Sequence, residues 1–263
     1  MKLIHLNVEY FKYFDALVDF LEVEKPDIIS LVEAVDGDFL WSGKERDYIG
    51  DLEEKFGWNS VFHPTVFRDF GEYRLGFGAA VMSRFPLTLE SAMYFGDQKP
   101  SVRPRDDIIF SDRPKYERYP YAWKLNLPFL STTVATEKWP LRLLTAHFHV
   151  SYECLETLQI WQDAEKVVEY INKVKPIPTI LTGDLNIRNE SMTIKTLSEK
   201  LTQESKKLTN TLCPSLCPYF DRVPGGRGLG IDHIFTRDIV ANTCEVRDVV
   251  VSDHLPLVLD FSL

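Results

Sequence analysis

The most constraining feature of this 263-residue sequence is a set of short apolar runs that each meet a polar side chain. In residues 179–186, the run Thr-Ile-Leu-Thr-Gly leads directly into Asp184 and Asn186. A turn would explain this ending, because Gly, Asp and Asn all favour turns. A catalytic edge of a sheet would explain it equally well, so the remaining runs have to decide.

Five further runs place polar side chains at a strand end or within a strand. They contribute Asn7, Glu33, His147, Asp232 with His233, and Asp253 with His254. Each residue alone has an ordinary structural explanation, such as a hydrogen bond to a nearby backbone group. Together they indicate a shared site, because ligands of α/β sheets bind beyond one end of the strands. Burying that many polar groups without partners would cost about 1–3 kcal/mol each.

The apolar runs alternate with segments of helical periodicity, which predicts layered α/β packing. Helices are expected at residues 10–25, 46–57, 155–175 and 191–201, and strands at 3–8, 27–33, 78–86, 121–127, 141–150, 176–184, 229–237, 244–251 and 256–263. Several consecutive strands have no helix between them, so mixed sheets are expected. The apolar face of the third helix is expected to comprise Leu158, Trp161, Ala164, Val168 and Ile171. No linker separates the two halves, and one domain over residues 1–263 is expected.

Composition limits the classes of partner and location. The hydrophobic content of 44% suffices for a sizeable core. The formal net charge of −9 argues against indiscriminate nucleic-acid binding, although it permits a local basic cleft. No apolar run reaches the length of a membrane span, and the N-terminal run shows no leader pattern. The four cysteines show neither a disulfide framework nor zinc spacing, so reduced thiols in a cytoplasmic protein are expected.

Six motifs, read in order, carry a resemblance to a known family: LNVE, SLVEA, LLTAHFH, LTGDLN, GIDHIF and VSDHLPL. This set resembles the endonuclease/exonuclease/phosphatase superfamily of the deoxyribonuclease I and exonuclease III type, from the first strand to the last. The resemblance implies an α/β fold, a four-layer sandwich of two packed mixed β-sheets flanked by helices. It also implies a metal-dependent hydrolase that cleaves phosphodiester bonds, with a nuclease-type phosphodiesterase as the first choice. The alternative is a phosphatase or lipid phosphodiesterase of the inositol-phosphate or sphingomyelin type.

The resemblance further implies a metal site and a substrate. Glu33, Asn7 and Asp253 correspond to the ligands of Mg²⁺ or Mn²⁺, which are hard cations that prefer oxygen donors. Arg118, in the stretch ERYPYAWKL, corresponds to a phosphate-contacting arginine, with a solvated loop arginine as an equal alternative. The expected substrate is a phosphodiester, with DNA and RNA among the candidates, and a monomer is expected. None of the matched metal or catalytic residues is missing, which argues against a catalytically inactive binding module.

The resemblance also implies the catalytic groups. His254 corresponds to the essential histidine near the scissile phosphate, and Asp232 to the acid that orients its imidazole. Asp184 and Asn186 correspond to the pair that positions the attacking water and holds a phosphate oxygen. His147 corresponds to a second, phosphate-binding histidine. His254 is the favoured general base, Asp184 is the open alternative, and the number of metal ions is left open.

Overall fold

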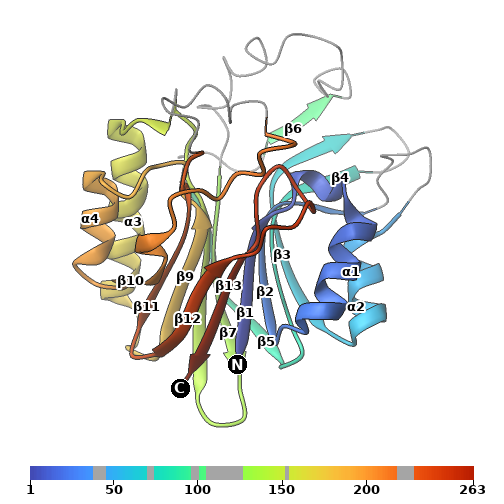
Figure 1. Ribbon diagram of the computed structural model, residues 1–263, viewed down its shortest axis with the longest axis horizontal. Helices are drawn as coiled ribbons and strands as arrows, with labels where there is room; N and C mark the ends of the chain where they lie inside the picture. The colour runs from blue at the N-terminus through green and yellow to red at the C-terminus, as the bar shows by residue number, and fades with distance from the viewer. Residues whose placement is uncertain (38–45, 70–73, 96–100, 105–126, 152–153, 218–227) are drawn as a thin grey trace.

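The computed structural model describes residues 1–37, 46–69, 74–95, 101–104, 127–151, 154–217 and 228–263. It confirms the four-layer arrangement, in which two mixed β-sheets pack face to face between helices (Figure 1). The first sheet has seven strands in the order β12 (Val240–Val246), β13 (Leu257–Ser262), β1 (Lys2–Asn7), β2 (Ile28–Asp36), β4 (Arg74–Ser83), β3 (Asn59–Asp69) and β6 (Ser101–Pro104). The second has six, in the order β10 (Thr202–Gln203), β11 (Asp232–Arg237), β9 (Thr179–Asp184), β8 (Pro140–His147), β7 (Pro128–Ala135) and β5 (Leu87–Tyr94).

Four α-helices of the described residues cover the outer faces of the sheets (Figure 1). They are α1 (Phe14–Glu24) and α2 (Tyr48–Phe56) on the first sheet, and α3 (Leu158–Lys173) and α4 (Met192–Ser198) on the second, with short 3₁₀ turns η1 (Glu9–Phe11) and η6 (Glu204–Lys207). The side chain of Asp47 caps α2 at its start, and Gly57, with a φ of 65°, ends it as expected. Among the residues that the structure describes, no helix combines the length and apolarity needed to cross a bilayer. All four cysteines are free thiols.

Alternation along the strands separates three apolar layers. In β1, Leu3 packs in the layer between the two sheets, whereas Ile4 and Leu6 pack in the layer that contains α1. A third layer joins the second sheet to α3 and α4. Because His5 and Asn7 alternate in phase with Leu3, their side chains share the face of β1 that meets the second sheet.

The buried face of α3 differs from the predicted one. Leu158 is 68% exposed, whereas Ile160 and Asp163 are completely buried. Asp163 accepts hydrogen bonds from the backbone N and from Nδ1 of His149, at 3.1 and 2.6 Å. Ala164 and Ile171 are buried as predicted, so the buried face is shifted in part and includes the carboxylate of Asp163.

Strand register places three of the predicted site residues in one row across the second sheet. β8 and β9 are parallel and pair His147 with Asp184, while β11 runs antiparallel to β9 and pairs Asp232 with Asp184. In the first sheet, β1 and β2 are parallel, and the last residue of β1, Asn7, pairs with Val32, which precedes Glu33. Because side chains of paired residues project to the same side of a sheet, the register itself gathers these polar groups at one edge.

Candidate active site

Asp184 lies at the centre of the predicted site. Its Oδ2 atom accepts a hydrogen bond from Nδ2 of Asn7 at 3.2 Å. The same oxygen lies 3.7 Å from Nε2 of His254 and 3.8 Å from Nε2 of His147. Its Oδ1 atom accepts a hydrogen bond from the backbone N of Asn186 at 3.0 Å. The structure thus brings together side chains from both sheets that lie far apart in the sequence.

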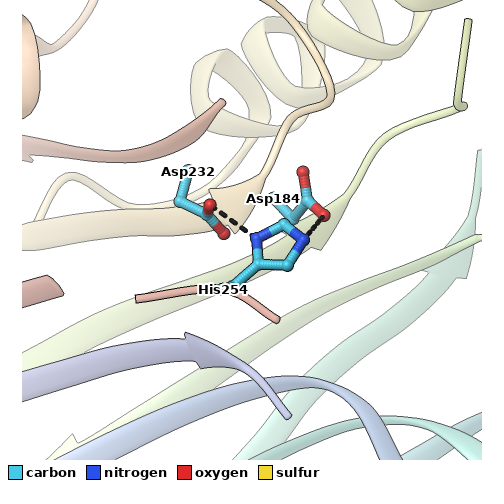
Figure 2. A group of neighbouring side chains, drawn as sticks. All are labelled: Asp184, Asp232 and His254. Carbon is cyan, nitrogen blue, oxygen red and sulfur yellow. Dashed lines mark hydrogen bonds and ion pairs between the residues drawn. The ribbon is translucent and has the colours of Figure 1, made fainter. Parts of the chain in front are cut away.

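Figure 2 shows the imidazole of His254 held between two carboxylates. Its Nδ1 donates to Oδ2 of Asp232 at 2.8 Å, and Oγ1 of Thr211 donates to the same oxygen at 2.6 Å. Burial would lower the pKa of His254, but the charges of Asp232 and Asp184 outweigh it and raise that pKa well above the ordinary value. Burial would raise the pKa of Asp232, yet the charge and hydrogen bond of His254 hold it well below the ordinary range.

Asp184 and His147 also have shifted pKa values, and both shifts favour the uncharged form of the side chain. Burial and the charge of Asp232 raise the pKa of Asp184 to about 6. Burial and the charge of His254 lower the pKa of His147 to about 3, so His147 is neutral at pH 7. The site therefore combines one favoured imidazolium with a neutral imidazole and carboxylates, which is a distribution typical of active sites.

Glu33 occupies a strained position in β2. Its backbone has a φ of 53°, in the left-handed region that residues other than glycine rarely adopt. The pairing of β2 with β4 shifts register between Leu31 and Ala34, which marks a bulge at this residue. Such strain costs about 1–3 kcal/mol and persists only where the surrounding structure enforces it, often at functional sites.

The oxygen donors around Glu33 fit a divalent cation. Burial, followed by the charge of Asp253, raises the pKa of Glu33 to about 8, while a hydrogen bond from Asn7 opposes that rise. A buried carboxyl group has so high a pKa when no nearby positive charge stabilises its ionised form. A bound hard cation would supply that charge. Carboxylate and amide oxygens are the donors that Mg²⁺ and Mn²⁺ prefer.

A second group of donors also lies close together. Ligand atoms of Asp184, Asp232 and His254 all lie within 4.8 Å of one another. Here, however, Nδ1 of His254 carries the proton that it donates to Asp232, and the two carboxylates favour a second proton on Nε2. A proton therefore competes with any cation in this group, so the oxygen donors around Glu33 provide the better cation site.

Three further residues were predicted for the site, which are Arg118, Asp253 and Asn186. Arg118 lies outside the described residues, so its phosphate contact stays a prediction. Asp253 is partly exposed, and its charge acts on both Glu33 and His254. Asn186 has a φ of 50°, and its Nδ2 donates to the backbone O of Phe148 at 3.1 Å, which fixes the orientation of the side-chain amide.

One buried residue beside the site was missed by the sequence analysis. His5 is completely buried between the sheets, with Nδ1 3.1 Å from the backbone O of Ser30 and Nε2 3.5 Å from Oδ1 of Asp232. The available signal was the alternation along β1, because His5 shares a strand face with Asn7.

His233 neighbours Asp232 in sequence but serves the fold. Its Nε2 donates to the backbone O of Ile187 at 2.8 Å, and its Nδ1 lies 3.3 Å from Nε2 of Gln203. Burial lowers the pKa of His233 to about 4, although the carbonyl of Ile187 opposes this. The side chain is thus held neutral and ties the loop after β9 to β11.

His233 is expected to make the folded state sensitive to acid. Its pKa is lower in the folded chain than in the unfolded chain, so its contribution is complete above about pH 6.5 and is lost as the pH falls towards 4. The loss amounts to about 3 kcal/mol over that interval. Urea unfolding at pH 7.5 and pH 4.5 should show a smaller loss of stability for His233→Gln than for the parent protein. An equal loss in both proteins would contradict this assignment.

Comparisons with known proteins identify the family and the fold of the chain. Residues 4–254 match the model of the endonuclease/exonuclease/phosphatase family. A family protein from Leptotrichia buccalis C-1013-b has a similar structure, with a TM-score of 0.68, 16% identity and complete coverage of both chains. A mannosyl-6-phosphatase from Bacteroides thetaiotaomicron VPI-5482 has a TM-score of 0.66, 14% identity and complete coverage of both chains. The D. rerio TDP2 complex with a single-strand DNA product has a TM-score of 0.66 and 14% identity, covering 100% of this chain and 99% of that chain.

Sequence identities this low show the fold alone, and the search of curated protein sequences found no match. The family model carries the assignment, because it spans the chain from β1 to His254. It covers every described strand that supplies a residue to the site. The chain therefore belongs to the endonuclease/exonuclease/phosphatase family, whose members hydrolyse phosphate esters.

Proposed function

We propose that this protein is a divalent-metal-dependent phosphodiesterase of the nuclease type. The observation that carries the proposal is the imidazole of His254, held between Asp232 and Asp184 beside the amide of Asn7. Phosphodiester hydrolysis needs a positioned water, neutralisation of charge on the phosphate oxygens and help for the leaving oxygen. The residues at this edge offer a group for each requirement.

Glu33, Asn7 and Asp253 are the proposed holders of Mg²⁺ or Mn²⁺. A bound divalent cation would neutralise charge on the phosphate and on the leaving oxygen. Asn7 is oriented for this task, because its Oδ1 accepts a hydrogen bond from the backbone N of Glu9 at 3.1 Å while its Nδ2 donates to Asp184. The bulge at Glu33 directs its carboxylate towards the same group of residues.

Asp184 is the proposed group that positions and deprotonates the attacking water. With a pKa of about 6 it is ionised at pH 7. His254 is proposed to bind a phosphate oxygen as an imidazolium, because a ring that already carries both protons cannot accept another. This assignment favours Asp184 as the general base, the alternative that the sequence left open. His147, neutral at pH 7, would hold a second phosphate oxygen.

A phosphatase is the second candidate, because one structurally similar protein is a mannosyl-6-phosphatase. Charge favours the diester. Glu33, Asp184, Asp232 and Asp253 place four carboxylates around one favoured imidazolium, so the group stays negative when all four are ionised and one divalent cation is bound. Such a site repels the dianion of a phosphate monoester more strongly than the monoanion of a diester.

The first test compares a diester with a monoester. In Mg²⁺ or Mn²⁺, the protein is expected to hydrolyse bis-p-nitrophenyl phosphate faster than p-nitrophenyl phosphate. A panel of single-stranded DNA, duplex DNA with an abasic site, RNA, inositol phosphates, sphingomyelin and mannose 6-phosphate would then define the substrate. Faster cleavage of the monoesters would support the phosphatase, and inactivity on every substrate would reject both candidates.

A further inference from the structure

His5 contacts the catalytic group from behind, out of reach of any substrate. It is completely buried in β1 and faces the second sheet. Its Nδ1 donates to the backbone O of Ser30, because a carbonyl oxygen can only accept. That bond fixes the ring, so Nε2 is directed at Oδ1 of Asp232, at 3.5 Å.

The two oxygens of Asp232 have separate surroundings. Oδ2 accepts hydrogen bonds from Nδ1 of His254 and Oγ1 of Thr211. Oδ1 is buried, and among the described residues it accepts no hydrogen bond, which leaves Nε2 of His5 as the polar atom that faces it. The ring of His5 therefore lies beside Oδ1 while His254 and Thr211 contact Oδ2, and these contacts together fix the plane of the carboxylate.

His5 also joins the two sheets directly beneath the site. The first sheet supplies Asn7 and Glu33, whereas the second supplies Asp184 and Asp232. The contact from His5 to Asp232 crosses between these two sheets. The position of His5 therefore affects the alignment of the oxygen donors of the first sheet with the carboxylates of the second.

We propose that His5 is a positioning residue of this active site, which holds Asp232 so that one carboxylate oxygen stays directed at Nδ1 of His254. The inference rests on the proposed function for its kinetic consequences, whereas the contact itself is independent of the substrate. Because His5 is buried, it acts on the rate of the chemical step and not on substrate binding. Loss of a residue that orients a catalytic group typically lowers activity about 10- to 100-fold.

Kinetics of three variants separate positioning from simple structural support. His5→Ala should lower kcat about 10- to 100-fold with little change in KM. His5→Gln should recover part of that loss, because its side chain occupies a similar space beside Oδ1 of Asp232. Ser83→Ala is the control, since Ser83 lies on β4 of the same sheet and its hydroxyl donates to the backbone O of Asp27 and accepts from the backbone N of Phe85. That control should retain the kcat of the parent protein even if its melting temperature falls.

A double-mutant cycle with Asp232→Asn tests whether His5 acts through that carboxylate. If it does, adding His5→Ala to Asp232→Asn should cost much less than His5→Ala costs alone. The same factor in both backgrounds would overturn the proposal, because structural support does not depend on the charge of residue 232. Unchanged kcat in folded His5→Ala would overturn it as well.

A proton NMR spectrum supplies a readout that does not need turnover. The Nδ1 proton that His254 donates to Asp232 should resonate at low field in the parent protein with Mg²⁺. In His5→Ala it should shift or broaden, and in Ser83→Ala it should stay in place. If the parent protein cleaves no phosphoester, the proposed function fails, yet this spectrum still tests the contact. A resonance that is unchanged in His5→Ala would reject the role of His5.

Discussion

Replacement of His254 by glutamine is expected to lower kcat for phosphodiester hydrolysis about 10³-fold. The imidazole lies between Asp232 and Asp184, whose charges raise its pKa well above the ordinary value. Glutamine keeps an amide donor near Asp232 but removes the positive charge that would meet the developing charge on phosphate. The substitution therefore removes transition-state stabilisation while leaving the surrounding carboxylates in place.

The measurement is a steady-state rate on bis-p-nitrophenyl phosphate at saturating Mg²⁺. His63→Gln is the matched control, because His63 lies on β3 and its ring packs against Tyr94, away from the carboxylates of the site. That control should hydrolyse the substrate at the rate of the parent protein. A His254→Gln variant that is folded and as active as the control would remove His254 from the reaction.

Glu33→Gln is expected to lower activity about 10²-fold at a fixed Mg²⁺ concentration and to weaken the metal dependence. The glutamine amide keeps the shape of the side chain, but it lacks the anionic oxygen that a divalent cation requires. Chelation with EDTA should abolish hydrolysis by the parent protein, and added Mg²⁺ or Mn²⁺ should restore it. The Mg²⁺ concentration that gives half-maximal activity should be higher for Glu33→Gln.

Asp36→Asn provides the matched control for Glu33→Gln. Asp36 lies three residues further along β2 and is exposed, so it carries the same type of charge on the same strand away from the site. Its Mg²⁺ titration should coincide with that of the parent protein. Identical titrations for all three proteins would show that the cation binds elsewhere, and the group formed by Asp184, Asp232 and His254 would then be the next to test.

The position of the candidate site at one sheet edge could be predicted, because a local change from apolar to polar residues marks the end of each strand. Runs such as 179–184 are apolar up to the residue where the backbone reaches the sheet edge, and the next polar side chain marks that edge. The distances between the site residues could not be predicted, because they depend on the register in which the strands pair. The pairing of Asp184 with both His147 and Asp232 is a property of three strands that the sequence does not align.

His5 and Asp163 show where the apolar pattern misleads. Each is a polar residue in a fully buried position, and each contacts a polar partner on another element of the fold. A periodicity argument groups residues by type, so it gives no reason to single out His5 or to include Asp163 in the buried face of α3. The partners Asp232 and His149 become visible only when the chain is folded.

The sequence analysis missed five strands of the described residues, which are β3, β5, β6, β7 and β10. β5 is an edge strand with three successive exposed residues, so it lacks a strong apolar alternation. β7 buries Ser131 and Thr132, which do not mark a core strand by composition. Ser131 and Arg142 instead bind the carboxylate of Glu90 at 3.3 and 2.9 Å. Polar contacts between neighbouring strands thus replace the hydrophobic signal.

The place of β13 has a consequence for biosynthesis. β13 inserts between β12 and β1, pairing Leu259 with Leu3, and His254 directly precedes it. A ribosome-bound chain that has not yet released β13 therefore leaves one side of β1 unpaired and lacks a docked His254. Docking of β13 thus couples completion of the first sheet to the placement of His254 beside Asp184 and Asp232.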